Sequence, residues 1–350
     1  MTDTLTIRRP DDYHLHLRDG AILAAVTKGS LDFGRAIIMP NLVPPVVDAA
    51  MVRAYRARIM DAVALTPGVS LEPLMTLYLT DDTTPATIDA AAEVCTAAKL
   101  YPAHATTNSA SGVNDIDALT PVLERMAERG MVLCIHGEVT DHSVDIFDRE
   151  AVFLERVLAP IRSRVPDLKI VLEHVSTRAA VAFVKEAPNM AATITAHHLV
   201  IDRNDLLAGG IRPHNYCLPI VKRREDREAL VAAATGEDDR FFFGSDSAPH
   251  TDMKKLGCCG AAGCFTAPVA MGILAHLFEN EGRLGTLEAF ASSRGAAFYG
   301  LAPHDDTITL VKGDPVALEP IATPDGPITL FNPGFPITWR VENSPALDGR

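Results

Sequence analysis

Short hydrophobic runs alternate with longer amphipathic stretches along most of the chain. The runs are rich in β-branched and aromatic residues, which is typical of buried strands. Eight strands are predicted, at Tyr13–Arg18, Arg35–Asn41, Leu71–Leu79, Ala98–Pro102, Met131–Gly137, Lys169–Val175, Ala192–His198 and Phe241–Asp246.

Between these runs the apolar positions recur at intervals of three and four, which indicates amphipathic helices. The predicted helices are Ala50–Leu65, Pro85–Ala97, Ile116–Arg129, Asp148–Arg164, Thr177–Glu186 and Glu225–Ala234. Near-continuous hydrophobic strands that alternate with helices indicate a parallel sheet covered on both faces. Eight such units predict an α/β fold of the (β/α)8 TIM-barrel type. A doubly wound open sheet is the alternative.

Two further helices are predicted after the last strand, at Ala267–Glu281 and Thr286–Tyr299. The segment 307–341 is rich in Pro and Gly and contains alternating runs such as Ile308–Val311. This segment is expected to form a short β-rich tail packed on the barrel. Because (β/α)8 barrels routinely exceed the usual domain size, residues 1–350 are predicted to form a single domain.

Charge and composition narrow the range of partners. The chain has 32 Lys and Arg against 45 Asp and Glu, and acidic residues directly follow its longest basic cluster, Lys222–Arg224. Nucleic acid is therefore not an expected partner. No run of 18 apolar residues exists, so no membrane span is expected. A polar start and only six cysteines in 350 residues favour a reducing, cytoplasmic location.

Side chains that bind metals gather at the ends of the predicted strands. His14 and His16 are two positions apart on the first strand and therefore share one face. Other candidates lie within later predicted strands or at their ends, namely Lys99, His136, His174 and Asp246. The carboxyl ends of barrel strands meet at one mouth, where the active sites of this fold lie. One His-x-His pair is weak evidence, but four histidines and an acid on four strand ends predict a metal site.

The segments that carry these residues resemble dihydroorotases of the amidohydrolase superfamily. The resemblance runs in order from about residue 5 to about residue 300, and its opening motif is DDYHLHLRDG at Asp11–Gly20. Further matching motifs are Met39–Asn41, Lys99–Ala103, Cys134–Glu138, Leu172–His174 and Gly244–His250. The first strand starts close to residue 1, which leaves no room for the leading β-domain of hydantoinases and allantoinases. The chain therefore looks like the short, homodimeric bacterial type.

The resemblance implies two Zn²⁺ ions per subunit. It assigns His14, His16 and Asp246 to one ion. It assigns His136 and His174 to the other, and imidazoles and carboxylates suit zinc. An ammonium group cannot bind a cation, so Lys99 is implied to carry a CO2-derived carbamate, as N6-carboxylysine, that bridges the ions.

The implied reaction is the reversible hydrolysis of (S)-dihydroorotate to N-carbamoyl-L-aspartate in de novo pyrimidine (UMP) biosynthesis. A bridging hydroxide is the nucleophile, and Asp246 is the catalytic general base and then the general acid. The substrate is a small anion. The residues that match substrate-binding positions are Arg18, Asn41 and His250 for the carboxylate, Leu218 and Ala262 for the amide edge, and Thr106 and Thr107 on a closing loop at Ala103–Val113.

Several alternatives stay open at this point. The chain could be another cyclic amidase, such as a hydantoinase or allantoinase. It could also be an inactive partner that scaffolds aspartate transcarbamoylase, although all six metal-binding positions are present. A metal-free phosphate-binding barrel is disfavoured because no glycine-rich loop follows the late strands.

Two other groups of His and Cys residues allow more than one interpretation. His197 and His198 could be metal ligands, but barrel packing or hydrogen bonding is favoured. Cys258, Cys259 and Cys264 could hold a structural zinc, but a loop near the mouth of the site is favoured because their spacing is not a paired C-x-x-C set.

Overall fold

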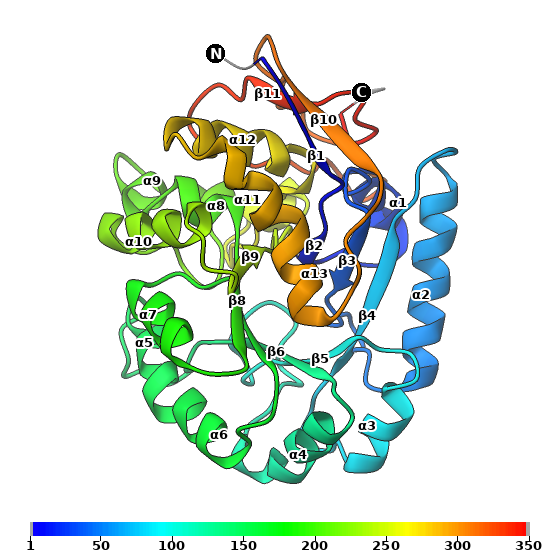
Figure 1. Cartoon of the computed structure of the whole chain (residues 1–350), viewed down its shortest axis with the longest axis vertical. Coiled ribbons are helices and arrows are strands. Elements are labelled where there is room, and N and C mark those ends of the chain that lie inside the picture. Colours follow the sequence, from blue (N-terminus) through cyan, green and yellow to red (C-terminus); the bar gives the residue numbers. More distant parts are fainter. Residues whose placement is uncertain (1–2, 348–350) are drawn as a thin grey trace.

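A barrel of eight parallel strands forms the centre of the molecule (Figure 1), in a computed structural model that describes residues 3–347. Neighbouring strands follow sequence order, which confirms the (β/α)8 fold and excludes the doubly wound sheet. The strands are β2 (Asp12–Leu15), β3 (Arg35–Ile38), β4 (Glu72–Tyr78), β5 (Ala97–Leu100), β6 (Val132–His136), β7 (Ile170–Glu173), β8 (Met190–Ile194) and β9 (Phe241–Phe243).

The chain beyond β9 links the last strand to the first. Asp246 donates its backbone N–H to the carbonyl of His14 at 2.9 Å, and His16 donates to the carbonyl of Ser247 at 3.1 Å. These bonds nearly close the barrel. They also bring the segment after β9 against the end of β2, where the two predicted ligand segments meet.

Helices surround the barrel (Figure 1), and the predicted ones occur in the predicted order. Four shorter helices were not predicted, at Leu23–Lys28, Ala196–Val200, Arg203–Leu207 and Asp252–Leu256. In chain order, the helices are α1 (Leu23–Lys28), α2 (Ala49–Ala64), α3 (Pro85–Ala91), α4 (Thr120–Glu128), α5 (Arg149–Phe153), α6 (Ala159–Arg164), α7 (Arg178–Glu186), α8 (Ala196–Val200), α9 (Arg203–Leu207), α10 (Arg224–Thr235), α11 (Asp252–Leu256), α12 (Ala270–Asn280) and α13 (Arg294–Tyr299).

Three predicted helices differ from those observed. The helix predicted at Thr286–Tyr299 consists of a π-helical turn at Ala289–Ser293 followed by α13. The helix that begins at Pro85 ends at Ala91 instead of Ala97, because Ala97 already belongs to β5. The single helix predicted over 148–164 consists of α5, a π-helical turn at Leu154–Leu158 and α6. Pro160 has no N–H to donate to the preceding turn, which accounts for the change in helical pitch.

The strand predicted at Ala192–His198 is wrong at its carboxyl end. The strand β8 ends at Ile194, and Thr195 caps the short helix α8 by accepting a hydrogen bond from the N–H of His198. The capping hydroxyl stabilises a helix start within an apolar run. His197 and His198 therefore lie on a helix and not on a barrel strand.

A small antiparallel sheet lies beside the barrel and contains the predicted tail. Its strands are β1 (Thr4–Arg8), β10 (Thr307–Lys312) and β11 (Trp339–Val341), and β10 is the middle strand. Trp339 is buried, and its indole N–H donates to Glu279 on α12 at 3.0 Å. The β-rich tail is confirmed, whereas β1 was not predicted. The assignment of the whole chain to one domain stays a prediction.

The hydrophobic core has an inner and an outer part. A small cluster that includes Tyr13, Val132 and Phe242 fills the barrel, and a larger one lies between the strands and the helices. Among residues 3–347, no helix combines the length and the apolar character that crossing a membrane requires.

Candidate active site

The predicted metal ligands leave their strands at one end of the barrel. His14 is on β2 and His136 is the last residue of β6, whereas His174 and Asp246 lie just beyond β7 and β9. The φ angles of His174 and Asp246 are 41° and 42°, in the left-handed region that side chains rarely adopt. Such strained backbone often occurs at functional sites, where the surrounding structure enforces it.

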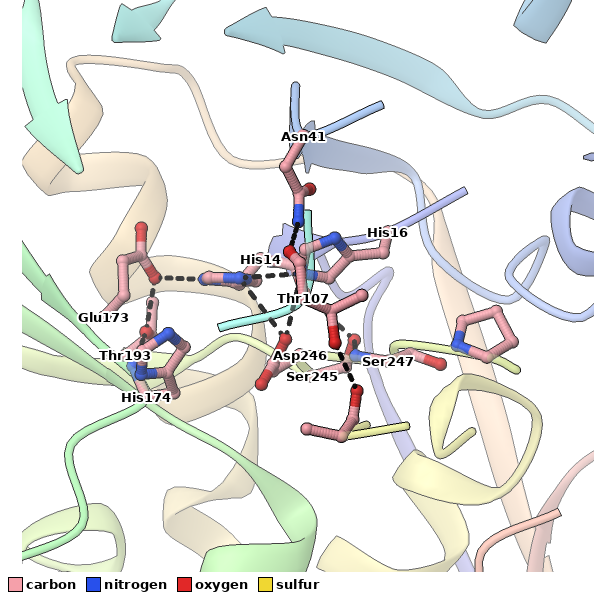
Figure 2. A network of polar contacts seen from close by, with 12 residues as sticks. His14, His16, Asn41, Thr107, Glu173, His174, Thr193, Ser245, Asp246 and Ser247 are labelled. Carbon is pink, nitrogen blue, oxygen red and sulfur yellow. Dashed lines mark hydrogen bonds and ion pairs between the residues drawn. The ribbon is translucent and has the colours of Figure 1, made fainter. Parts of the chain in front are cut away.

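His14, His16 and Asp246 form one buried cluster (Figure 2). The Nε2 atoms of the two histidines are 3.3 Å apart, and Asp246 Oδ1 lies 3.4 Å from His14 Nε2 and 3.1 Å from His16 Nε2. Burial lowers the pKa of both histidines, which favours the neutral, metal-binding form of the ring. This donor set suits a divalent cation such as zinc.

His136, His174 and Lys99 lie next to this cluster. The ring centroid of His174 is 4.8 Å from that of His136 and 4.9 Å from that of His14. Lys99 is fully buried, and its Nζ has no hydrogen-bond partner among the described residues. Because an unpaired buried ammonium is costly, burial lowers the pKa of Lys99 and favours the neutral amine. A neutral amine is the form that reacts with CO2, so the site fits a carbamate at Lys99.

Two buried glutamates orient the histidines, and the sequence analysis did not predict their role. Glu173 Oε2 accepts from His14 Nδ1 at 2.7 Å (Figure 2), and Glu138 Oε2 accepts from His136 Nε2 at 2.8 Å. These bonds leave His14 Nε2 and His136 Nδ1 free for metals. The available signal was an acidic residue beside a histidine in each of two buried motifs, Cys134–Glu138 and Leu172–His174.

We expect Glu138→Gln to weaken metal binding about 10–100-fold, because the amide cannot hold His136 as a carboxylate does. Competition between the protein and a chelator for the metal measures this change. Glu124→Gln, at an exposed position on α4, is the matched control. Unchanged metal affinity in Glu138→Gln would show that Glu138 does not orient the ligand.

Arg18 and His250 meet at the rim of the cluster. Arg18 donates from Nε to the carbonyl of Pro249 at 3.1 Å, and its backbone has a φ of 59°. The Nε2 atom of His250 lies 3.0 Å from Arg18 Nη2 and 3.0 Å from the carbonyl oxygen of Ala262. Pro249 and His250 therefore hold the guanidinium of Arg18, which lines the cavities described below.

The loop at 103–113 lies over the metal-ligand cluster in a closed position. Asn41 donates from its amide to the carbonyl of Thr107 at 3.0 Å (Figure 2). The hydroxyl of Thr107 donates to the carbonyl of Ala262 at 3.3 Å. These contacts separate an inner cavity of about 20 Å³, beside the ligands, from an outer cavity of about 780 Å³. Five predicted substrate residues line both cavities, namely Arg18, Thr106, Thr107, Leu218 and Ala262.

The remaining His and Cys candidates have separate surroundings. His198 is hydrogen-bonded to Thr195 Oγ1 and to the carbonyl of Pro219, each at 2.9 Å, which confirms the interpretation preferred from the sequence. Neither ring nitrogen of the buried His197 has a hydrogen-bond partner within residues 3–347.

The three cysteines form no shared metal-ligand group within the described part of the chain. Cys258 and Cys259 are exposed and line the outer cavity, as predicted for a loop near the mouth. Cys264 is buried, and its thiol donates to the carbonyl of His214 at 3.4 Å.

A (β/α)8 barrel with His, Asp and Lys side chains gathered at the carboxyl ends of its strands defines a metal-dependent hydrolase of the amidohydrolase type. Comparison with known proteins agrees with this class, although no protein-family model matches the chain. The chain is 60% identical over 347 residues to a dihydroorotase of Ruegeria sp. (strain TM1040). The aligned region covers 97% of this chain and 100% of the relative.

Two solved structures resemble the whole chain. The dihydroorotase from Campylobacter jejuni has a TM-score of 0.89 and 35% identity, over 98% of each chain. The dihydroorotase from Saccharomyces cerevisiae, in complex with 5-fluoroorotic acid, has a TM-score of 0.88 and 34% identity, over 97% of this chain and 99% of the other. The chain therefore belongs to the dihydroorotase family. Members of this metal-dependent family are cyclic amide hydrolases that interconvert dihydroorotate and carbamoyl aspartate in pyrimidine biosynthesis.

Proposed function

We propose that the chain hydrolyses (S)-dihydroorotate reversibly to N-carbamoyl-L-aspartate with two Zn²⁺ ions per subunit. The observation that carries this proposal is the buried cluster of His14, His16 and Asp246 beside a cavity that Arg18 also lines. Following the family resemblance, we propose that the active protein is a cytoplasmic homodimer, and light scattering on the pure protein tests the oligomeric state.

Six residues would hold the two ions. His14, His16 and Asp246 would bind one ion, whereas His136 and His174 would bind the other. Lys99, as a carbamate, would supply one oxygen to each ion. This would give a function to its buried Nζ, which has no hydrogen-bond partner among the described residues. When bound, the ions would lower the pKa of water toward about 7 and polarise the ring carbonyl of the substrate.

Asp246 is the proposed proton carrier. Its carboxylate is buried and lies within 3.4 Å of both histidines, so it would contact the metal and the attacking water together. In the metal-free site, burial raises the pKa of Asp246. It would accept the proton of the attacking water and deliver it to the ring nitrogen that leaves.

The substrate carboxylate would bind to Arg18, Asn41 and His250, with the guanidinium making a two-point contact. The backbone groups of Leu218 and Ala262 would hold the amide edge of the ring. Because the amide of Asn41 bonds to Thr107 in the closed loop, entry of the substrate requires the loop with Thr106 and Thr107 to move.

Elemental analysis combined with a hydrolysis assay tests the proposed function. We expect about two Zn²⁺ per chain and activity on dihydroorotate, with little activity on hydantoin or allantoin. Chelation should abolish the activity, and added zinc should restore it. A fully active preparation without metal would refute the proposal.

We expect Arg18→Met to lower kcat/KM for dihydroorotate by about 2–5 kcal/mol, the cost of removing one partner of a desolvated charge pair. Arg18→Lys should also lower it, because Lys keeps the charge but loses the planar fork. Activity on an uncharged cyclic amide is the control and should change little. Equal losses on both substrates would mean that Arg18 only holds the mouth of the barrel, through its bond to Pro249.

A further inference from the structure

One lysine outside the metal cluster joins the two loops that carry Leu218 and Ala262. Lys255 lies on α11, is only 4% exposed and points its Nζ between the loops. It donates to the carbonyls of Tyr216 at 2.8 Å, Ala261 at 2.9 Å and Gly263 at 2.7 Å. An ammonium group has three N–H donors, so these three carbonyls satisfy it completely.

The charge of Lys255 is held by backbone carbonyls and not by a carboxylate. Within residues 3–347, no ion pair involves Lys255. Burial of a cation is unfavourable unless hydrogen bonds compensate for the lost water. A hydrophobic residue would fill this space more simply if packing were its only purpose. The arrangement therefore favours a specific task for the ammonium.

A buried group of ligand-type side chains lies near Lys255. Ligand atoms of His197, His198 and Cys217 lie within 4.8 Å of one another. Burial, the neighbouring His198 and Lys255 lower the pKa of His197 and favour its neutral form.

The loops that Lys255 joins are fixed against the segment that contains Asp246. Gly263 donates its N–H to the carbonyl of Tyr216 at 2.9 Å, which connects the loops directly. Gly263 has a φ of +140°, and a Cβ there would lie 2.4 Å from the carbonyl oxygen of Ala248. The next residue, Cys264, accepts from the N–H of Ala248 at 2.8 Å. This junction thus holds the backbone of both loops against the segment that contains Asp246, in addition to the contacts that His250 and Thr107 make with the carbonyl of Ala262.

We infer that Lys255 is a positioning residue that holds the backbone groups of Leu218 and Ala262 in place for the amide edge of the substrate. This inference rests on the proposed function, because those backbone groups bind the ring only if dihydroorotate is the substrate. Lys255 itself lies beneath the loops and need not touch the substrate.

Steady-state kinetics of Lys255→Met tests the inference. We expect the KM for dihydroorotate to rise about tenfold or more, because charge-assisted hydrogen bonds to three carbonyls are lost. The zinc content should stay unchanged, and kcat should fall less than KM rises. Lys255→Arg, which keeps a charged donor, should raise KM by a smaller factor. Lys254→Met, at the exposed neighbouring position on the same helix, should behave as the wild type.

Hydrogen exchange provides a readout that does not depend on activity. The amide of Gly263 should exchange faster in Lys255→Met than in the wild type or in Lys254→Met, since its acceptor, Tyr216, is held by Lys255. An unchanged KM and unchanged exchange in Lys255→Met would overturn the inference, as would a loss of zinc and kcat with unaltered KM. If Lys255→Met does not fold, the same two measurements on Lys255→Arg decide. Zinc-loaded wild type that does not hydrolyse dihydroorotate would refute the proposed function instead, and the exchange result would still report on the junction.

Discussion

Asp246→Asn is expected to lower kcat for dihydroorotate hydrolysis by about 10²–10⁴, the range for a lost general acid–base group. The amide keeps the shape of the side chain and one oxygen for the metal, but it cannot accept the proton of the attacking water. The buried carboxylate is within 3.1 Å of His16 and 3.4 Å of His14, and no other carboxylate joins this ligand group in the described chain. Single-turnover and steady-state rates, measured at equal zinc content, give the effect on the chemical step.

The control for this substitution is Asp314→Asn, at an exposed position that lies after all the ligand motifs in the sequence. It removes the same charge and should leave kcat unchanged. A near-wild-type kcat in Asp246→Asn, with both metals bound, would assign the proton transfer to a different group. A loss of zinc with the loss of rate would show that Asp246 acts mainly as a ligand.

The sequence was informative about the barrel because each strand is a local pattern. A run of hydrophobic residues between two amphipathic stretches can be recognised without knowledge of the fold, and all eight strands were found this way. The metal-type residues then followed from one rule, that active sites of this fold lie at the carboxyl ends of the strands. The structure brings His14, His16 and Asp246 together from segments more than 200 residues apart.

The errors have local causes that hydrophobic periodicity does not reveal. The last predicted residues of the strand near His198 belong to a helix, because the hydroxyl of Thr195 caps a new helix within an apolar run. The strand β1 does alternate, with Leu5 and Ile7 between polar residues, but the run is short and its partner β10 is about 300 residues away in the sequence. So short an alternation does not by itself show that the segment pairs with a strand near residue 310.

The side chains that orient the site residues could also not be predicted from sequence patterns. Glu138 and Glu173 stand inside recognised motifs, but their hydrogen bonds to His136 and His14 depend on the barrel. Lys255 bonds to three backbone carbonyls, and a backbone carbonyl has no residue-type signature. Sequence reasoning found the side chains that are proposed to bind the metals and the substrate, whereas three-dimensional contacts were needed to find those that orient these side chains.

Lys99→Ala is expected to reduce activity by about 10³ or more and to lower the zinc content, since several kcal/mol of metal-assisted stabilisation would be lost. Lys99 is fully buried, and its Nζ lies over the ring of Tyr101 but has no hydrogen-bond partner in the described structure. As an ammonium it would repel two dications, but as a carbamate it would supply an oxygen to each. Rates and metal content, with Lys185→Ala at an exposed position on α7 as the control, measure the effect.

Small carboxylic acids such as acetate separate the carbamate from a merely structural lysine. In Lys99→Ala they can enter the space left by the side chain and replace the missing oxygens, so part of the activity and of the zinc binding should return. They should not rescue Asp246→Asn, because that protein keeps its carbamate and lacks a base. Carbon-13 NMR after exposure to labelled CO2 should show a carbamate signal in the wild type that is absent from Lys99→Ala. Two bound zinc ions beside an unmodified Lys99 ammonium would refute the carbamate, because a positive charge cannot bridge the two cations.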